Sequence, residues 1–256
     1  MTDRNHSPPK AAPGWSRIEI GGKSADIFEP RTPSPQNFAV LFLHGHGLNT
    51  LRDNPVFTAE FERCGLRCVC PLGQRSWWGD RVCREFDAEV TPIQFLRELV
   101  VPWMADRWGT RPPGIGLLGV SMGGQGVLKL AFGYPKDFPV VAALAPTVDF
   151  YLWYGLGLPL DEIYPDQEAA RQDTVTLWLH PLNWPRQMFL ACDPDDDWFD
   201  SVDRLASKLS SSGIPYEREL SIRRGGHSWD YFNHLAPRVV GFIAERLDQE
   251  GRRYTG

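Results

Sequence analysis

The stretch IGLLGVSMGG, residues 115–124, decides the fold of this chain. Its first half is a continuous apolar run, typical of a strand buried on both faces of a sheet. Its second half, Gly119 to Gly123, matches the pattern G-x-S-x-G, and a helix is predicted directly after it over Met122–Phe132. This pattern between a strand and a helix predicts a sharp, strained turn that exposes the serine hydroxyl. Ser121 is therefore the candidate nucleophile, and a capping serine in a Gly-rich turn is the ordinary structural alternative.

Outward from this turn, short apolar runs alternate with longer amphipathic segments, as in a mostly parallel sheet covered by helices. The predicted strands are Arg17–Ile20, Ala25–Phe28, Phe38–Leu43, Leu66–Pro71, Ile115–Val120, Val140–Leu144, Gln187–Cys192 and Tyr216–Ile222. Further helices are predicted over Thr91–Trp108, Phe199–Ser211 and Leu235–Leu247, where apolar residues recur close to every 3.6 positions. The first two strands are predicted to form an antiparallel hairpin around Gly21-Gly22. The fold class is therefore α/β, with about eight strands flanked by helices.

The composition limits the partners and the setting of the chain. With 27 basic and 32 acidic residues and no Lys/Arg run, nucleic acid and anionic membranes are poor partners. The first residues lack the apolar core of a signal peptide, and no apolar run approaches the ~20 residues of a membrane-spanning helix. An odd count of five cysteines indicates reduced thiols. We therefore expect a cytoplasmic protein with a disordered tail over residues 1–14 and a single domain over residues 15–256. Homo-oligomer formation stays open.

A serine hydroxyl needs a neighbouring base to become a strong nucleophile. On folds with this turn, the serine is followed along the chain by an acid and then by a histidine. Of the six histidines, only His227 and His234 follow a plausible acid. His227 lies in a Gly-flanked loop after the last predicted strand, whereas His234 lies further on, where the final helix begins. His227 is therefore the candidate general base.

The candidate acid lies in the loop after the strand Gln187–Cys192, which reads DPDDDWF from position 193. A carboxylate here would accept a hydrogen bond from the imidazole and fix its tautomer. The other aspartates of the loop would cap the following helix. Asp196 is favoured, followed by Asp197 and Asp195. Asp149, at the end of the preceding strand, is a more remote alternative.

An oxyanion hole needs two backbone N–H donors. One is expected from Met122, the residue after the nucleophile, and the other from the loop His44-Gly45-His46-Gly47 after an earlier strand. The backbone of His46 is the first choice and that of Gly47 the second. His44 is expected to make structural hydrogen bonds instead.

Two segments rich in Trp, Tyr and Gly follow predicted strands at their carboxyl ends, where α/β sheets place ligand sites: Gln74–Glu89 and Asp149–Pro185. Ordinary packing under long loops and an aromatic-walled pocket are equally good interpretations. On the second interpretation, the substrate-binding walls are Trp77, Trp78, Trp153 and Tyr154. No metal site is expected, because Cys64, Cys68 and Cys70 form no CxxC pair and the last two lie in an apolar strand.

Four pieces of this sequence together resemble one family: LFLHGHG, GVSMGGQGVLKLAFGYP, the Asp-rich loop ending in Trp-Phe, and GGHSWDYF. The chain is similar to the esterase D/feruloyl esterase-like branch of the α/β-hydrolases over roughly Phe38 to Ile243. The resemblance implies the α/β-hydrolase fold, with Ser121 as nucleophile, His227 as base and an aspartate among Asp195–Asp197 as acid. It also implies ester cleavage without a cofactor, on substrates that include S-formylglutathione and hydroxycinnamoyl esters.

The chain departs from this family at several places. The S-formylglutathione hydrolases carry a cysteine in the oxyanion loop, where this chain has His-Gly-His-Gly, and the secreted feruloyl esterases carry a signal peptide. The segment Asp149–Pro185 has no matching counterpart.

The sequence predicts a serine esterase acting on a small-molecule carboxylic ester, or a thioester, through an acyl-enzyme. The alternatives are an oligopeptidase-like serine peptidase and a non-catalytic binding protein on the same fold.

Overall fold

The computed structural model describes residues 14–255 of the 256-residue chain. It contains one eight-stranded sheet, whose strands are β1 (Gly14–Ile20), β2 (Lys23–Glu29), β3 (Ala39–Leu43), β4 (Arg67–Pro71), β5 (Ile115–Val120), β6 (Val140–Leu144), β7 (Gln187–Ala191) and β8 (Glu217–Glu219). Each predicted strand is present, with ends that differ by a few residues. Of the tail predicted over residues 1–14, only Gly14 belongs to the described residues, and it begins β1.

The strand order is β1-β2-β4-β3-β5-β6-β7-β8. The hairpin β1–β2 and the pair β2–β4 are antiparallel, and all other neighbouring strands are parallel. The hairpin turns at Gly21 and Gly22, whose φ angles of 55° and 75° suit glycine. The predicted fold class, a mostly parallel sheet of the α/β type, is confirmed.

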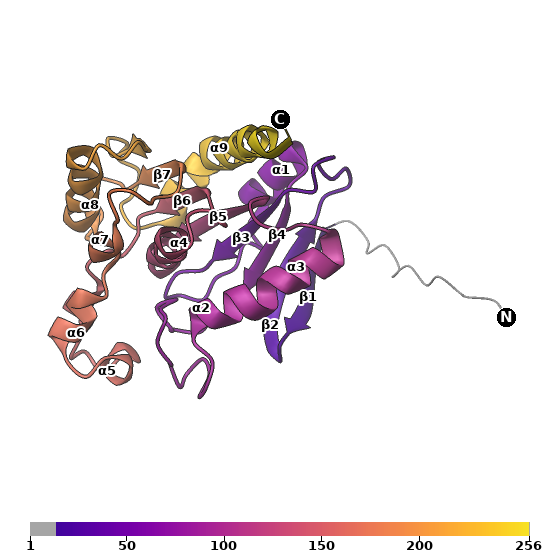
Figure 1. Ribbon diagram of the computed structural model, residues 1–256. Helices are drawn as coiled ribbons and strands as arrows, with labels where there is room; N and C mark the ends of the chain where they lie inside the picture. Colours follow the sequence, from indigo (N-terminus) through magenta and orange to yellow (C-terminus); the bar gives the residue numbers. More distant parts are fainter. Residues whose placement is uncertain (1–13, 256) are drawn as a thin grey trace.

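The helical elements follow the strands in the usual alternation (Figure 1). They are α1 (Pro55–Cys64), α2 (Pro92–Phe95), the π-helical turn η1 (Leu96–Val100), α3 (Val101–Trp108), α4 (Met122–Gly133), the 3₁₀ turn η2 (Phe150–Trp153), α5 (Leu160–Ile163), α6 (Gln167–Gln172), α7 (Val175–Trp178), α8 (Phe199–Ser211) and α9 (Trp229–Thr255). The predicted helix over Thr91–Trp108 is present as α2, η1 and α3 in succession. Helix α8 has the predicted ends.

Two of the longer helices differ from the prediction, and the short helices α5, α6 and α7 were not predicted. Helix α1 was not predicted, although its ends carry clear signals: Asn54 accepts hydrogen bonds from the backbone of the first turn, Pro55 begins the helix, and Gly65 ends it at φ 64°. Helix α9 begins at Trp229, six residues before the predicted start at Leu235, and continues past Leu247. Pro237 inside α9 obscured the helical pattern at its beginning.

Helices cover both faces of the sheet. A Cβ on Gly116 of β5 would collide with Ile243 of α9, and a Cβ on Gly119 would collide with Gly123 of α4. Because residues three apart on a strand point to opposite faces, α9 and α4 lie on opposite sides of β5. Helix α1 packs beside α9, and α4 packs against β3, β5 and β6. The central strands β3, β5 and β6 are consequently buried along their whole length.

The last strand, β8, is shorter than the strand predicted over Tyr216–Ile222. Only Glu217–Glu219 pairs with β7, and the three residues are exposed or half-buried. Two of the three are glutamates and the third is arginine, as expected for an edge strand that resists pairing with another chain. The remaining residues, from 220 to 228, form the loop that carries His227.

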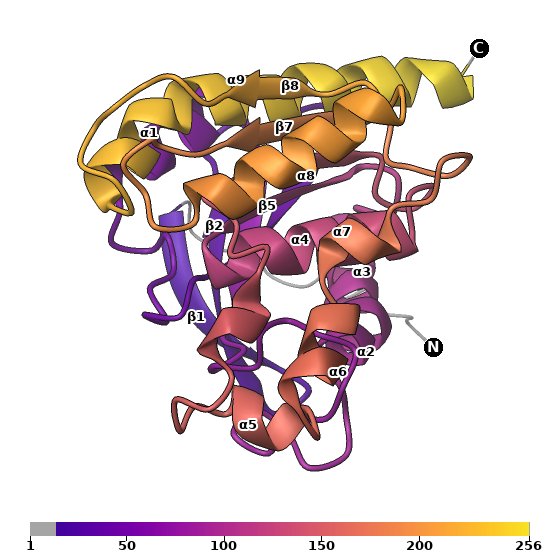
Figure 2. The same ribbon diagram turned by 90° about the vertical axis from the view of Figure 1, so that its left-hand side faces the viewer.

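The Trp-rich segment 149–185 forms η2, α5, α6 and α7. Helices α5 and α6 lie at the lower left in Figure 1 and in the lower part of Figure 2. A buried ion pair fastens this insertion to α4: the Lys129 ammonium binds the Asp173 carboxylate. Tyr164 and Trp178, both from the insertion, donate to the same carboxylate. The insertion is therefore held against α4, the helix that directly follows Ser121.

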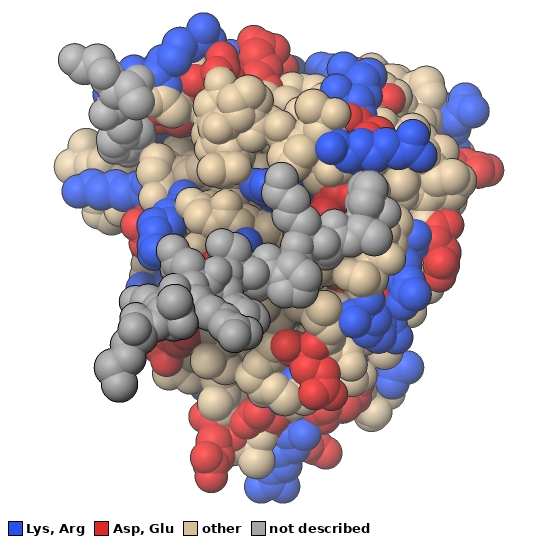
Figure 3. Space-filling model, turned by 90° about the vertical axis from the view of Figure 1, so that its right-hand side faces the viewer, with Lys and Arg blue, Asp and Glu red and all other residues tan. Residues whose placement is uncertain are grey.

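The surface charges and the lengths of the helices can be compared with the prediction that nucleic acid and membranes are not partners. On the part of the face that is visible in Figure 3, basic and acidic side chains are interspersed rather than gathered into a continuous basic surface. None of the helices described between residues 14 and 255 is both long and apolar enough to span a membrane.

Candidate active site

Ser121 lies in the sharp turn between β5 and α4, with φ 56° and ψ −123°. A residue other than glycine seldom adopts a positive φ, and such strain persists only where the surroundings hold it. Here the Ser121 backbone N–H donates to Leu144 O at 2.9 Å, and its carbonyl accepts from Thr147 N at 3.2 Å. The strained turn predicted from the sequence is therefore present and is held from the neighbouring strand β6.

The glycines on either side of Ser121 are required by close backbone contacts. A Cβ on Gly123 would lie 1.9 Å from Leu43 O, and a Cβ on Gly119 would lie 2.2 Å from Gly123 O. Neither neighbour is a flexible side chain that could move away. The turn thus packs α4 directly against the ends of β3 and β5, which a larger residue would prevent.

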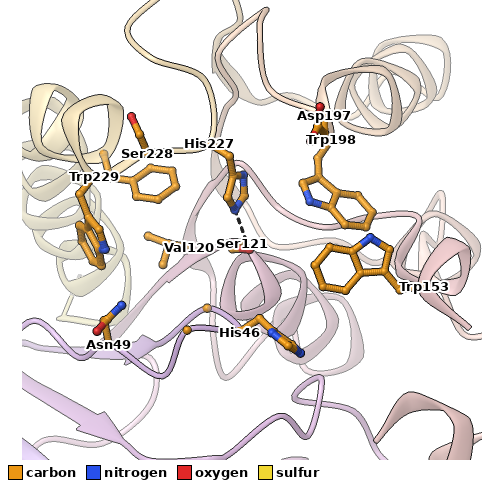
Figure 4. A pocket seen from close by; sticks show the side chains of 13 residues that line it. His46, Asn49, Val120, Ser121, Trp153, Asp197, Trp198, His227, Ser228 and Trp229 are labelled. Carbon is orange, nitrogen blue, oxygen red and sulfur yellow. Dashed lines mark hydrogen bonds between the residues drawn. The ribbon is translucent and has the colours of Figure 1, made fainter. Parts of the chain in front are cut away.

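Ser121, His227 and Asp196 are joined by hydrogen bonds, although they come from three different loops. His227 Nε2 lies 2.8 Å from Ser121 Oγ (Figure 4). On the other side of the ring, His227 Nδ1 lies 2.7 Å from Asp196 Oδ2. A carboxylate can only accept, so Nδ1 carries the proton and Nε2 is left to accept from the serine hydroxyl. Ser121 and Asp196 are buried, whereas the His227 side chain is one-third exposed.

The four aspartates of the loop after β7 have separate environments. Asp196 Oδ1 accepts from Trp198 N at 2.8 Å, which leaves Oδ2 for His227. Asp195 forms an exposed ion pair with Arg223, and Asp197 lines the pocket beside the serine. The structure thus brings Asp196, the first choice from the sequence, to the histidine. Asp149, the remote alternative, pairs instead with Arg204.

Asp193, the first aspartate of that loop, ties it to the histidine loop. Its buried carboxylate accepts from the backbone N–H groups of Asp195, Arg224 and Gly226. Burial alone would raise the pKa of Asp193, but these three N–H donors hold it below its ordinary value. Gly226 has φ 63°, and a Cβ there would lie 3.1 Å from Asp195 O. Asp193 therefore fixes the two loops that carry Asp196 and His227 against each other. The prediction that the other aspartates cap the following helix is wrong, because the N-cap of α8 has no side-chain hydrogen bond.

The loop after β3 approaches Ser121 from the other side. A Cβ on Gly45 would lie 3.0 Å from Ser121 Cβ, so the backbone itself is close to the serine. The His46 side chain points away from Ser121 (Figure 4), and its ring packs edge-on against Trp153 with centroids 5.4 Å apart. Met122 is the first residue of α4. Of the two residues expected to supply oxyanion donors, Met122 directly follows Ser121, and His46 follows Gly45 and lines the same pocket as Ser121.

His44 makes structural hydrogen bonds. Gly73 N donates to His44 Nε2 at 3.0 Å, so Nδ1 must carry the proton that it shares with Gly45 O at 2.8 Å. Burial lowers the pKa of His44 to about 4, because a charged imidazole would be desolvated there. His44 therefore stays neutral at pH 7 and connects the loops that follow β3 and β4.

The buried thiol beside the candidate site is a poor candidate nucleophile. This thiol is that of Cys192, whose pKa is raised first by burial and then by Asp196. A thiol with a raised pKa stays protonated and is a poor nucleophile. Among residues 14–255, no group of three or more His, Cys, Asp or Glu side chains is arranged to hold a metal ion.

A pocket of about 330 Å³ opens above the serine. Trp153 and Trp198 lie at one end of it, Trp229 and Asn49 lie at the other, and Ser121 and His227 lie between them (Figure 4). Trp153 and Trp198 pack with ring centroids 5.4 Å apart.

Of the four predicted pocket walls, only Trp153 lines the pocket. Trp77 and Trp78 are 1% and 0% exposed, so they belong to the core instead. Trp77 packs behind Trp153, and Trp78 donates from Nε1 to His44 O at 3.0 Å. Tyr154 lies outside the pocket lining, and its hydroxyl donates to Pro165 O. A loop with weak periodicity gives no sign of which aromatic rings face inward, and this accounts for the error.

Several lining residues were not predicted, namely Asn49, Trp198, Ser228, Trp229 and Phe232. A signal for three of them was present in the sequence, because Ser228 and Trp229 directly follow His227 and Phe232 lies five residues after it. Trp198 similarly lies two residues after Asp196. Residues that follow a catalytic candidate in a loop at the strand ends are natural pocket walls.

Comparisons with known proteins agree with this geometry. The family described as “Putative esterase” matches residues 84–242. No curated protein sequence matches the chain.

Among solved structures, the chain is similar to the substrate-bound serine hydrolase FphF of Staphylococcus aureus, with a TM-score of 0.73 and 14% identity over 90% of this chain and 99% of that one. It is similar to an S-formylglutathione hydrolase from Agrobacterium tumefaciens, with a TM-score of 0.70 and 18% identity over 91% of this chain and 94% of that one. It is also similar to a ferulic acid esterase, with a TM-score of 0.71 and 13% identity over 91% of this chain and 99% of that one. At these identities the likeness establishes the fold, which is that of the α/β-hydrolases. Because the family match spans more than half of the chain, this protein belongs to that esterase family and is a carboxylic ester hydrolase.

Proposed function

We propose that this chain hydrolyses a small-molecule carboxylic ester, or a thioester, with Ser121 as nucleophile, His227 as general base and Asp196 as the acid of the triad. The observation that carries the proposal is the continuous hydrogen-bonded path from Asp196 through both ring nitrogens of His227 to Ser121 Oγ. This tautomer of His227 is the one that can take the serine proton.

In the first step, Ser121 Oγ attacks the ester carbonyl while His227 Nε2 takes its proton. The imidazolium that forms is stabilised by Asp196, which accepts from Nδ1. His227 then gives the proton to the departing alcohol, and the acyl group remains on Ser121. Water repeats the sequence on the acyl-enzyme and releases the carboxylic acid.

The negative charge on the carbonyl oxygen needs donors that are already in place. We assign this role to the backbone N–H groups of Met122 and His46. Met122 begins α4, and the N-terminus of a helix favours negative charge. The close approach of Gly45 to Ser121 supports His46 as the second donor. Loss of one such donor costs on the order of 3 kcal/mol in the barrier.

The proposed setting is the cytoplasm. All five cysteines are free thiols, and Cys68, Cys70, Cys83 and Cys192 are buried. Reduced thiols are the rule in that compartment. The proposed partner is a small-molecule ester, without nucleic acid and without a cofactor.

A fluorophosphonate probe tests the proposal, because it reacts only with an activated serine. The expected result is one adduct per chain, mapped by peptide mass spectrometry to Ser121, and none on Ser121→Ala. A protein that keeps the fold only for binding would not react. Turnover of p-nitrophenyl esters and a matched thioester, but not of a peptide p-nitroanilide, would separate the esterase from the peptidase alternative. Absence of both labelling and ester turnover would contradict the proposal.

A further inference from the structure

A second cavity adjoins the pocket above Ser121. Its volume is about 410 Å³, and Asn49 and Trp229 line both cavities. In Figure 4 these two residues lie on the side of Ser121 opposite to Trp153 and Trp198. The second cavity therefore adjoins the pocket on the side of Ser121 that lies away from the aromatic end.

The second cavity is lined by amides, a hydroxyl and one charge of each sign. Its polar residues are Arg17, Asn49, Thr50, Asp53, Asn54 and Asn233. The Arg17 guanidinium is already bound through Nε and Nη2 to the buried Asp26, and Asp53 adds the opposite charge at the rim. A cavity with this balance does not select a charged group.

Some of these polar groups still have capacity for hydrogen bonds. Asn54 Nδ2 donates to Asn233 Oδ1 at 2.7 Å, which turns the Asn233 amide so that its Nδ2 remains a donor. Among residues 14–255, none is hydrogen-bonded to the side chains of Asn49 or Asp53, although both line the cavity. The site thus offers two amides and a carboxylate beside the flat ring of Trp229, which suits several hydroxyl groups on a compact ring.

The order of the reaction decides which half of an ester occupies this cavity. In the second half of the reaction, water attacks the acyl-enzyme along the path by which the alcohol left, because the same histidine serves both steps. Water must therefore arrive from the side on which the alcohol was bound. The polar cavity can hold water, whereas the end formed by Trp153 and Trp198 presents aromatic rings. The acyl group therefore belongs at the aromatic end and the alcohol at the polar end.

We propose that the second cavity is a leaving-group subsite that selects esters of uncharged, hydroxyl-rich alcohols, with Asn49 and Asn233 as the residues that read the hydroxyl groups. This inference rests on the proposed function of Ser121. The alcohol half of the substrate would bind in the second cavity, and the acyl half would bind at the aromatic end.

The test compares two butanoate esters that differ only in the polarity of a six-membered ring: 6-O-butanoylglucose and cyclohexylmethyl butanoate. Because both give the same acyl-enzyme, a difference in kcat/KM reports the alcohol alone. The wild-type protein is expected to favour the glucose ester at least about tenfold, the effect of one or two hydrogen bonds. Asn233→Leu is expected to reduce that ratio at least about fivefold.

Asn183→Leu is the matched control, since Asn183 is an exposed asparagine that lines a different cavity, beside Trp184. It is expected to keep the wild-type ratio. Thermal melts of both variants check that they are folded.

The outcomes separate this inference from the proposed function. If wild type hydrolyses both esters equally well, or if Asn233→Leu leaves the ratio unchanged, the subsite is overturned while the esterase stands. If Asn233→Leu instead alters discrimination between polar and apolar acyl groups on a common p-nitrophenol, the cavity serves the acyl half and the proposal is wrong. If no ester is hydrolysed and Ser121 takes no fluorophosphonate, both proposals fail.

Discussion

At the scale of single residues, the candidate site depends on a few close contacts that only one type of residue can make. The turn at Ser121 can form only because Gly119 and Gly123 let the backbone of α4 lie against β3 and β5. His227 has the tautomer that its partner Asp196 imposes. Each of these features can be changed by one substitution.

Asp196→Asn is expected to reduce kcat/KM for p-nitrophenyl butanoate at least about 10³-fold, because an amide can hold His227 in the wrong tautomer. Steady-state kinetics of the purified variant would measure this. Asp195→Asn is the control, since Asp195 forms an exposed pair with Arg223, and a rate within threefold of wild type is expected. An equal loss in both variants would assign the effect to the loop rather than to the triad.

Gly123→Ala is expected to lower the free energy of unfolding by at least about 3 kcal/mol, because its Cβ would lie 1.9 Å from a backbone oxygen. Gly133→Ala at the other end of α4 is the matched control, since its Cβ would meet only Trp178 at an ordinary 3.6 Å. We expect this control to change stability by less than about 1 kcal/mol. Urea unfolding at pH 7 distinguishes the two, and similar stabilities would show that the contact at Gly123 can relax.

The pKa of His44 predicts a dependence of stability on pH. The unfolded imidazole has a pKa of roughly 6.5, whereas the folded one is lowered by burial to about 4, so protonation favours the unfolded state. The contribution of His44 is complete above about pH 6.5 and declines as the pH falls toward 4. Between pH 7 and 4.5 the wild type should lose about 2–3 kcal/mol more than His44→Gln, measured by urea unfolding. His234 is exposed, so His234→Gln should show the same change of unfolding free energy with pH as wild type. The same change in His44→Gln would contradict this prediction.

The sequence was sufficient to predict Ser121 and His227 because each lies in a motif with a local geometric meaning. It could only favour Asp196 over Asp195 and Asp197, since the direction of each carboxylate depends on partners far away in the chain, such as Arg223 and His227. Trp77 and Trp78 were assigned to the pocket by composition, and only tertiary packing reveals that their rings are buried.

At the scale of helices and strands, the site is assembled from loops at the carboxyl ends of β3, β5, β7 and β8. The apolar runs predicted these strands well, because a strand buried on both faces has a distinctive composition. Helix α1 was missed since only two of its ten residues, Phe57 and Phe61, are buried, and a mostly solvated helix shows a weak apolar pattern.

The insertion over residues 149–185 is held to α4 by a buried charge, which predicts an asymmetric response to mutation. Asp173→Asn leaves the Lys129 ammonium buried without its counter-ion and should cost roughly 3 kcal/mol of unfolding free energy. Adding Lys129→Met to this variant should restore most of the loss, because the unpaired charge is then removed. Urea unfolding of the two single variants and the double variant measures the coupling. Additive losses would mean that the ion pair does not fasten the insertion.

At the scale of the whole molecule, the cleft beside Ser121 has an aromatic end and adjoins a polar cavity on the opposite side of the serine. The sequence alone could not foresee this cleft, because its walls come from the insertion, the β3 loop and the beginning of α9. These segments are more than a hundred residues apart at the extremes, from Asn49 to Trp229. The strand order of the sheet brings these segments together.

The charge distribution predicts that the rate on neutral esters depends little on salt. The net charge is −5, and the charges visible in Figure 3 are interspersed, so an uncharged substrate experiences no electrostatic steering. Raising NaCl from 20 to 500 mM should change kcat/KM for p-nitrophenyl butanoate by less than about twofold. A steep decline with salt would indicate that charged groups guide the substrate into the cleft.

The central claim is that Ser121 is the nucleophile of an ester hydrolase, and the most direct test is the hydrolysis of p-nitrophenyl butanoate by wild type and Ser121→Ala. Both proteins should have the same far-UV circular dichroism and thermal midpoint, because the hydroxyl group is not needed for folding. The account predicts that wild type turns the ester over and that Ser121→Ala loses at least ~10³-fold in kcat/KM. A folded alanine variant that retains the wild-type rate would contradict it.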